Sequence, residues 1–418
     1  MRRAALPLCG AVLTLCVLAW SRQGDATGRV ASHLALYGLA FAAYLGGLRS
    51  AEGLSRRGLV LALGLAVLWR AALVLAPPLL SNDINRYVWE GRVQVHGGNP
   101  YAWPDRPDAP RWEGLRDEVW RGLNHADYPA IYPPLWQFAA WAVVALSDSV
   151  TAMKAFLVLS ELLMLWPLAL VLQRRGLPPE RLLVLAWSPL ALVEIAGSGH
   201  NEAFGMLFLV LALAALEYGH PLASAVAAAL GLQAKFLPGL VALAWGRRYR
   251  GGQLLLAAGV ALLLLLPYAS AGHVFWLSLS KYASFWRFNE TLFAALLALL
   301  GSHRAAAVTA AALAVALSLA LAAARAEPVA AGTLVVAASL LLGPNVLPWY
   351  ALWFLPFLVV RPEPAALLFT GTVALAYLVY PAWQSGERWE VGWGIRAFEY
   401  GPCLAVALMA ARTPRPVP

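Results

Sequence analysis

Two carboxylic acids, a guanidinium group and a phenol lie close together in one short polar stretch, SNDINRYVWEGR at residues 81–92. A helix would place residues at i, i+3, i+4 and i+7 on one face. The residues at this spacing are Asp83, Arg86, Tyr87 and Glu90. A carboxylate in such a cluster can accept a proton from a hydroxyl group. The stretch is therefore a candidate active site.

The same stretch also has a purely structural interpretation. Ser81 or Asn82 could cap the helix, and Asp83 in the first turn would face the positive end of the helix dipole. Asp83 and Arg86 would then form an ordinary surface ion pair, which contributes little to stability. This stretch alone does not decide between the two interpretations.

The composition predicts the structure that must position these residues. Of the 418 residues, 61% are hydrophobic and 13% are charged, whereas soluble proteins average about 25% charged residues. Apolar runs of about 17 to 22 residues recur along the chain, and each can cross a bilayer as a helix. We therefore expect an all-α, polytopic integral membrane protein with about 11–13 transmembrane helices, forming a single domain over residues 1–418.

The same composition argues against several function classes. The net charge of +9 does not indicate nucleic-acid binding, because many arginines lie in short loops beside apolar runs, as the positive-inside rule predicts. All three cysteines lie in apolar runs and suggest neither disulfides nor a metal cluster. No glycine-rich nucleotide-binding motif is present in the sequence. Any chemistry must therefore use sites at or in the membrane.

The charges also predict how the chain crosses the cell (inner) membrane. The first three spans lie at about 4–20, 30–48 and 58–76. Their cytoplasmic flanks are marked by Arg49, Arg56 and Arg57. The polar segment at about 77–130, with eight acidic and six basic residues, is then extracytoplasmic, and Arg412 and Arg415 predict a cytoplasmic tail. The remaining basic loops cannot all be cytoplasmic if every apolar run crosses fully, so we expect one or two re-entrant or broken segments.

Prolines and aromatic residues divide the long polar segment. Residues 99–101 are predicted to form a turn, since proline fixes φ and disfavours helix at the residue before it. Residues 111–123 carry apolar side chains at helical spacing, which predicts a short helix lying on the membrane interface. In IYPPLWQ, at residues 131–137, the two prolines would open a helix and Tyr132 would lie at the headgroups.

Three further polar groups interrupt apolar runs, and ionisable residues in such places indicate function by default. His200, Asn201 and Glu202 lie between two spans in GSGHNEAF, although they could simply cap a helix end. Lys235, beside a proline in LQAKFLPGL, could snorkel to the interface or point into a polar cavity as a phosphate ligand. Asn345 lies between two prolines in PNVLPWY, which cannot be ordinary helix interior.

These groups suit transfer of a sugar from a lipid-linked phosphate better than most other reactions. Phosphate, whose second pKa is about 6, leaves without a general acid, so one base on the acceptor hydroxyl suffices. A single displacement by that hydroxyl inverts the configuration of the sugar carbon. No His, Asp or Glu cluster in the sequence has the spacing of metal ligands, so we expect neither a metal nor another cofactor.

A resemblance to a known family covers nearly the whole chain. It is carried, in order, by SNDINRYVWEGRVQVHGGNPY, IYPPLWQ, GSGHNEAF, LQAKFLPGL and PNVLPWY. In these segments the chain resembles the bacterial polyprenyl-phosphate-mannose-dependent mannosyltransferases of the GT-C superfamily. One departure is Leu347, because several relatives carry histidine immediately before Pro-Trp-Tyr. A mechanism assisted by a histidine at that position is therefore not expected.

The resemblance implies roles for individual residues. Asp83 matches the aspartate of the first loop that acts as general base on the acceptor. The residues implied at the acceptor or around Asp83 are Arg86, Tyr87, Glu90, Arg92, Asn99 and Tyr101. Those implied at the donor are Tyr132, Gln137, His200, Asn201, Glu202, Lys235, Asn345, Trp349 and Tyr350. Charge on the phosphate would be neutralised by Arg86, Lys235 or Arg287.

The sequence thus predicts an inverting membrane glycosyltransferase. It would move a hexose, with mannose expected, from a polyprenyl-phosphate sugar donor to a hydroxyl group of an extracytoplasmic glycan, glycolipid or other acceptor. A polytopic transporter or lipid flippase is the alternative, because it would also contain buried Lys and Glu residues and broken helices. Such a protein would have less need of the long polar segment.

Overall fold

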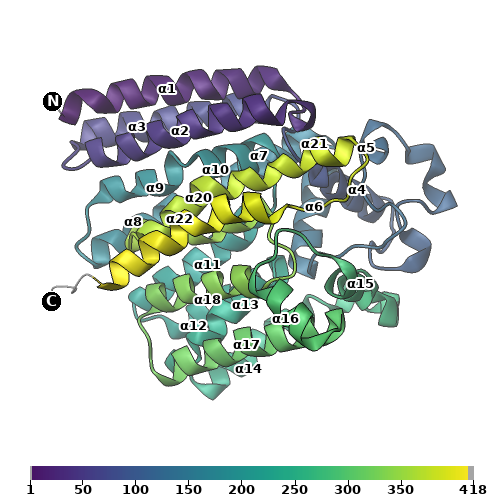
Figure 1. Ribbon diagram of the computed structural model, residues 1–418. Coiled ribbons are helices and arrows are strands. Elements are labelled where there is room, and N and C mark those ends of the chain that lie inside the picture. Colours follow the sequence, from purple (N-terminus) through teal and green to yellow (C-terminus); the bar gives the residue numbers. More distant parts are fainter. Residues whose placement is uncertain (1, 413–418) are drawn as a thin grey trace.

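The computed structural model describes residues 2–412, which form helices joined by turns, and it confirms the predicted all-α fold (Figure 1). Arg415 of the predicted cytoplasmic tail lies outside the described residues. The first three helices begin and end within a few residues of the predicted spans and pack side by side (Figure 1). They are α1 (Arg2–Gln23), α2 (Val30–Ser50) and α3 (Arg56–Val74).

The rest of the chain alternates longer helices with short ones. The longer helices are α4 (Asp83–Val95), α6 (Pro134–Leu146), α7 (Val150–Leu163), α8 (Leu165–Arg174), α11 (Glu202–Glu217), α12 (Pro221–Ala234), α13 (Leu237–Ala244), α14 (Gly251–Leu263), α15 (Leu277–Phe285), α16 (Leu292–Leu300), α17 (His303–Ala323), α18 (Pro328–Leu342), α20 (Pro364–Thr372) and α22 (Trp393–Arg412). The short ones are α5 (Glu118–Arg121), α9 (Leu183–Ala186), α10 (Pro189–Ala191), α19 (Leu355–Val360) and α21 (Val379–Gln384). A π-helix at Leu192–Gly197 and a 3₁₀-helix at Pro348–Phe354 also contribute to the site described below.

Six helical segments of the described chain are long and apolar enough to cross a membrane, which is fewer than the 11–13 predicted. They are Ala5–Gln23, Thr27–Ser50, Arg56–Val74, Val150–Arg174, His303–Ala323 and Pro364–Gln384. A seventh is obtained if Gly251–Leu263 and Leu266–Phe285, which meet at 82°, count as one bent span. The difference arises because several apolar runs are broken. Lys235 and Phe236, for example, lie between α12 and α13, and Pro238 stands in the first turn of α13, where proline is tolerated.

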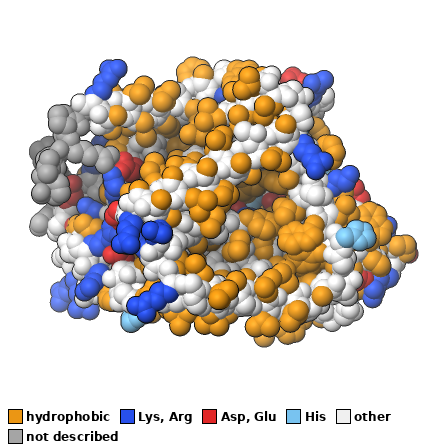
Figure 2. Space-filling model, turned by 90° about the horizontal axis from the view of Figure 1, so that it is seen from below, with side chains coloured by type: hydrophobic (Ala, Val, Ile, Leu, Met, Phe, Trp, Pro, Cys, Tyr) orange, Lys and Arg blue, Asp and Glu red, His pale blue; other side chains and the backbone are white. Residues whose placement is uncertain are grey.

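The outer surface agrees with a membrane location. Figure 2 shows apolar side chains across the middle of one face, while Lys and Arg side chains gather towards its two edges. This is the distribution expected for a helical protein whose central band contacts hydrocarbon and whose ends contact water and headgroups.

The long polar segment lies at one end of the molecule, opposite both ends of the described chain (Figure 1). The predicted interfacial helix at 111–123 is divided into a 3₁₀-helix, Pro110–Leu115, and α5. Its apolar side packs onto α4, because Trp112 is buried in one cluster with Trp89 and Val93. The segment therefore folds back over α4.

Buried charges fix the point at which the chain leaves α3 and enters this segment. The ammonium of Lys154 donates hydrogen bonds to the carbonyls of Leu73 and Ala76, at 2.6 and 2.7 Å, and so satisfies the end of α3. About two turns further along α7, Glu161 accepts two hydrogen bonds from the guanidinium of Arg70, at 2.8 and 2.5 Å. These contacts hold α3 against α7, so the start of α4 has a fixed position.

Candidate active site

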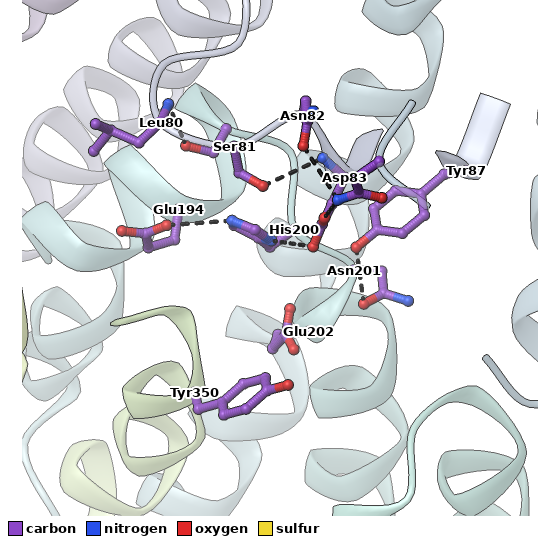
Figure 3. A network of polar contacts seen from close by, with 12 residues as sticks. Leu80, Ser81, Asn82, Asp83, Tyr87, Glu194, His200, Asn201, Glu202 and Tyr350 are labelled. Atoms are coloured by element: carbon purple, nitrogen blue, oxygen red, sulfur yellow. Dashed lines mark hydrogen bonds and ion pairs between the residues drawn. The ribbon is translucent and has the colours of Figure 1, made fainter. Parts of the chain in front are cut away.

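Asp83 begins α4 and its carboxylate points towards a buried loop rather than into an ion pair with Arg86 (Figure 3). Its Oδ1 accepts a hydrogen bond of 2.8 Å from Asn124, and its Oδ2 lies 3.9 Å from Nδ1 of His200. The side chain keeps 22% of its surface exposed. Ser81 accepts the backbone N–H of Asp83, whereas Asn82 makes no side-chain cap. The surface ion-pair interpretation of Asp83 and Arg86 is therefore wrong.

The environment of Asp83 favours a proton acceptor. Burial raises the pKa of its carboxyl group above the ordinary value. The hydrogen bond from Asn124 and the positive charges of Lys235 and Arg86 oppose this shift. A carboxylate with a raised pKa holds a proton more strongly, which suits a general base.

Arg86 is fully engaged with the protein. Its guanidinium bonds Glu90 at 2.7 Å and donates to the carbonyls of His125, Tyr128 and Pro129 at 2.9, 2.5 and 2.7 Å. The side chain of Arg86 thus fastens the end of the long polar segment to α4. This segment carries Asn124, so Arg86 supports Asp83 indirectly.

His200, Asn201 and Glu202 lie in the loop between the π-helix Leu192–Gly197 and the first turn of α11. Gly199 has φ +84°, and a Cβ there would lie 2.3 Å from Cδ1 of Ile84 on α4. Only glycine allows this loop to approach α4 so closely. This close approach places the loop residues His200, Asn201 and Glu202 near Asp83.

The imidazole of His200 is wholly buried and stacks on the indole of Trp349, with ring centroids 3.7 Å apart and 18° between the planes. Its Nε2 lies 3.5 Å from Oε2 of Glu194. Glu194 in turn accepts hydrogen bonds from the hydroxyl of Tyr377, at 2.9 Å to each oxygen. Side chains from α4, from the π-helix and from the 3₁₀-helix Pro348–Phe354 therefore surround this ring. Figure 3 shows the carboxylates of Asp83 and Glu194 on its two sides.

Lys235 points inwards at the break between α12 and α13. Its ammonium lies 2.7 Å from a carboxylate oxygen of Glu202, donates to Oδ1 of Asn201 at 2.7 Å, and lies over the ring of Tyr132. The side chain is 14% exposed. Lys235 therefore does not snorkel to the surface, and its charge enters the same polar site.

Phenol and amide side chains line the side of this polar site away from Glu194. Tyr87 lies 3.4 Å from both Tyr132 and Asn201, hydroxyl to hydroxyl and hydroxyl to Oδ1. Tyr350 shares a hydrogen bond of 2.9 Å with Tyr282, whose hydroxyl also accepts from Asn345 at 2.8 Å.

We call the following residues the buried polar cluster: Asp83, Glu194, His200, Asn201, Glu202 and Lys235. Several of its polar atoms have no hydrogen-bond partner within residues 2–412, namely both nitrogens of His200, Nδ2 of Asn201 and Oε2 of Glu202. Oδ1 of the neighbouring Asn345 is also unpartnered in this part of the chain. Buried polar atoms are rarely left unpaired, so these atoms are available to bind water or a polar ligand.

The remaining predicted site residues make contacts within the protein, most of them with the long polar segment or with α4. Arg92 pairs with Asp117 and Asp148, both at 2.8 Å. Asn99 bonds the backbone of Tyr268 and the hydroxyl of Ser270. Three more are also engaged by other residues. Tyr101 donates a hydrogen bond to the carbonyl of Tyr132, and Gln137 donates one to Glu90. Arg287 forms an ion pair with Glu290.

An apolar cavity of about 140 Å³ adjoins the site. It is lined by Tyr101, Tyr132, Pro133, Phe236, Phe275 and Trp276, among others. Tyr132 belongs to both, because its other contacts are Tyr87 and Lys235. No group of three His, Cys, Asp or Glu residues in the described chain could hold a metal ion.

Sequence reasoning missed three residues of the site, Asn124, Tyr282 and Tyr377. None stands out, because Asn124 lies in an irregular loop and the two tyrosines lie among other aromatic and apolar residues. Their importance comes from partners that are distant in sequence, Asp83, Asn345 and Glu194.

Comparison with known proteins gives two matches. The family model described as alpha-(1->6)-mannopyranosyltransferase, N-terminal domain, matches residues 2–247. A curated relative, a probable alpha-(1->6)-mannopyranosyltransferase of Mycolicibacterium smegmatis, is 25% identical over 435 aligned residues, covering 84% of this chain and 75% of the relative. No solved structure matches the chain. These findings confirm the resemblance to mannosyltransferases.

Proposed function

Because the chain belongs to the alpha-(1->6)-mannopyranosyltransferase family, we propose that it transfers mannose from a polyprenyl-phosphate donor to a hydroxyl group of a glycan or glycolipid acceptor, with Asp83 as the general base. Family membership favours a glycosyltransferase over the transporter or flippase considered above. We further propose that the protein lies in the inner membrane with the long polar segment on the extracytoplasmic side.

The observation that carries the proposal is the environment of the Asp83 carboxylate, namely its burial and its contacts. Its carboxylate is mostly buried and contacts an amide and an imidazole rather than an arginine or lysine. A carboxylate that accepts a strong ion pair is a poor base, whereas one raised in pKa by burial is a better one. The 22% of its surface that is exposed leaves room for the acceptor hydroxyl.

The donor side is supported by the rest of the buried polar cluster. The unpartnered atoms of Asn201, Glu202 and Asn345 match the several hydroxyl groups of a hexose. The ammonium of Lys235 can attract a phosphate oxygen. The apolar cavity beside Tyr132 suits the first units of a prenyl chain.

The stereochemistry follows from a single displacement. The acceptor oxygen attacks the anomeric carbon opposite the phosphate, while Asp83 removes the hydroxyl proton and the bond to phosphate breaks. The configuration inverts, so an alpha product requires a beta-linked mannosyl donor. The arrangement needs no second catalytic carboxylate, because phosphate leaves without protonation.

The test uses purified protein in lipid nanodiscs with a beta-mannosyl polyprenyl phosphate and an alpha-(1->6)-mannan oligosaccharide acceptor. We expect an alpha-linked product, and at least about a hundredfold slower transfer by Asp83→Asn. Asp148→Asn is the control, because it makes the same change in an exposed carboxylate that pairs with Arg92. Undiminished transfer by Asp83→Asn, or no transfer by the wild type, would contradict the proposal.

A further inference from the structure

His200 lies between two carboxylates that belong to different parts of the chain. Asp83 Oδ2 is 3.9 Å from its Nδ1, and Glu194 Oε2 is 3.5 Å from its Nε2. The two acids are therefore connected through one ring, as the row of side chains in Figure 3 shows. Within the described residues neither ring nitrogen has a hydrogen-bond partner, although the ring is wholly buried.

Hydrogen bonds hold the two ends of this row, and a stacking contact holds the ring between them. Tyr377 holds both oxygens of Glu194, and Asn124 holds one oxygen of Asp83. Trp349 covers one face of the imidazole in a near-parallel stack. A small shift of the ring parallel to this stack would bring Nδ1 or Nε2 into hydrogen-bonding distance of its carboxylate.

Burial raises the pKa of Glu194 to about 8, so both carboxylates are ionised above that pH, where transfer is to be measured. A neutral imidazole cannot satisfy two ionised carboxylates at once. It carries one N–H group and one nitrogen lone pair. The nitrogen nearer to its carboxylate is Nε2, so we place the N–H there, donating towards Glu194. The lone pair of Nδ1 then faces Asp83, which is the longer of the two separations. A proton that arrives on Asp83 turns this repulsion into a hydrogen bond.

From this geometry we infer that His200 is a positioning residue that passes the proton taken up by Asp83 on to Glu194, an inference that rests on the function proposed above. The O–H bond of the acceptor breaks and its proton goes to Asp83, as the new bond to the sugar carbon forms and the phosphate leaves with its electron pair. The proton on Asp83 then moves to Nδ1 of His200, and the proton on Nε2 moves to Glu194. Atoms and charge balance without another reactant.

The relay matters because the bound acceptor closes the other exit. Asp83 reaches the surface only through its small exposed fraction, which the acceptor must cover. Several neighbouring groups are engaged elsewhere: Lys235 pairs with Glu202, Tyr350 bonds Tyr282, and Tyr87 bonds Tyr132. His200 lies within 4 Å of both Asp83 and a second carboxylate, that of Glu194.

The test measures single-turnover transfer in mixtures of H₂O and D₂O. His200→Phe keeps the stack on Trp349 and removes both nitrogens, and Glu194→Gln removes the final proton acceptor at nearly constant volume. We expect each to slow transfer by about a hundredfold. We also expect a curved dependence of rate on D₂O fraction for the wild type, which indicates several moving protons, and a linear one for the variants.

The matched control is His220→Phe. His220 lies between α11 and α12, at the ends of these helices opposite Glu202 and Lys235, and its side chain makes no cap hydrogen bond. Its variant should transfer at the wild-type rate with the wild-type curvature. Transfer by both His200→Phe and Glu194→Gln within threefold of wild type, with unchanged curvature, would overturn the relay. If Asp83→Asn is also fully active, the proposed function itself fails.

Discussion

Nε of Arg86 lies 2.7 Å from Oε1 of Glu90, one helical turn further along α4, and this pair directs the guanidinium onto three carbonyls of residues 125–129. The contact makes the arginine a structural clamp on the segment that carries Asn124. It also explains why a residue next to the base need not bind the substrate phosphate.

Replacing Arg86 by lysine should loosen this clamp. A single ammonium cannot reproduce the planar fork that serves Glu90 and three carbonyls. We expect a loss of about 3 kcal/mol in unfolding free energy, typical of a broken buried ion pair. Arg106→Lys, in a partly exposed pair with Asp108, should cost less than about 1 kcal/mol. Equal thermal stability of the two variants in the same detergent would contradict the clamp.

The acid side of the pH profile should report Asp83. As general base it must be ionised, so transfer falls as the pH drops through its pKa, which burial raises above the ordinary carboxyl value. The hydrogen bond from Asn124 lowers this pKa. Asn124→Ala should therefore move the acid limb to higher pH and leave transfer closest to wild type at alkaline pH. An acid limb that stays in place in this variant would show that Asp83 is not the titrating group.

Lys235 should act on the donor rather than on folding alone. Lys235→Met removes the cation and leaves Glu202 buried and unpaired, so both transfer and stability should fall. The double variant Lys235→Met with Glu202→Gln removes the unpaired charge, and it should regain stability without regaining transfer. Initial rates against donor concentration and thermal unfolding measure the two effects. Recovery of transfer in the double variant would mean that Lys235 serves only to neutralise Glu202.

Gly199 should tolerate no side chain. Alanine would meet Cδ1 of Ile84 at 2.3 Å and would hold a φ of +84°. We expect Gly199→Ala to reduce stability by about 1 to 3 kcal/mol and to displace His200. Gly219→Ala also has a positive φ, +76°, but nothing lies within 4 Å of the added carbon. The second variant should lose stability without losing transfer, and similar transfer in both would argue against the close approach of the loop to α4.

The sequence predicts local features better than contacts between distant segments. The helices α1 to α3 and the start of α6 at Pro134 follow from apolar length and from proline, both of which act over a few residues. His200 and Lys235 were singled out because polar groups are costly in apolar surroundings, and Asp83 because its spacing places it on one helix face with Arg86 and Glu90.

The partners of these residues could not be predicted. Asn124 bonds Asp83, and Tyr282 bonds Asn345, across long stretches of sequence, so the contacts arise only when folding brings these segments together. The carbonyls that bind Arg86 carry no side-chain signal at all. The structure has fewer long straight helices than the number of spans predicted for a similar reason, since hydropathy cannot distinguish one straight helix from two halves that meet at a break.

The 82° bend after α14 joins the candidate site to a segment whose tilt depends on the bilayer. The segment beyond the bend includes α15, which carries Tyr282, and Tyr282 accepts a hydrogen bond from Asn345. A mismatch between bilayer thickness and helix length is taken up by tilting, which would move a bent pair together with Tyr282. The proposed transfer should therefore depend on the acyl-chain length of the surrounding lipids.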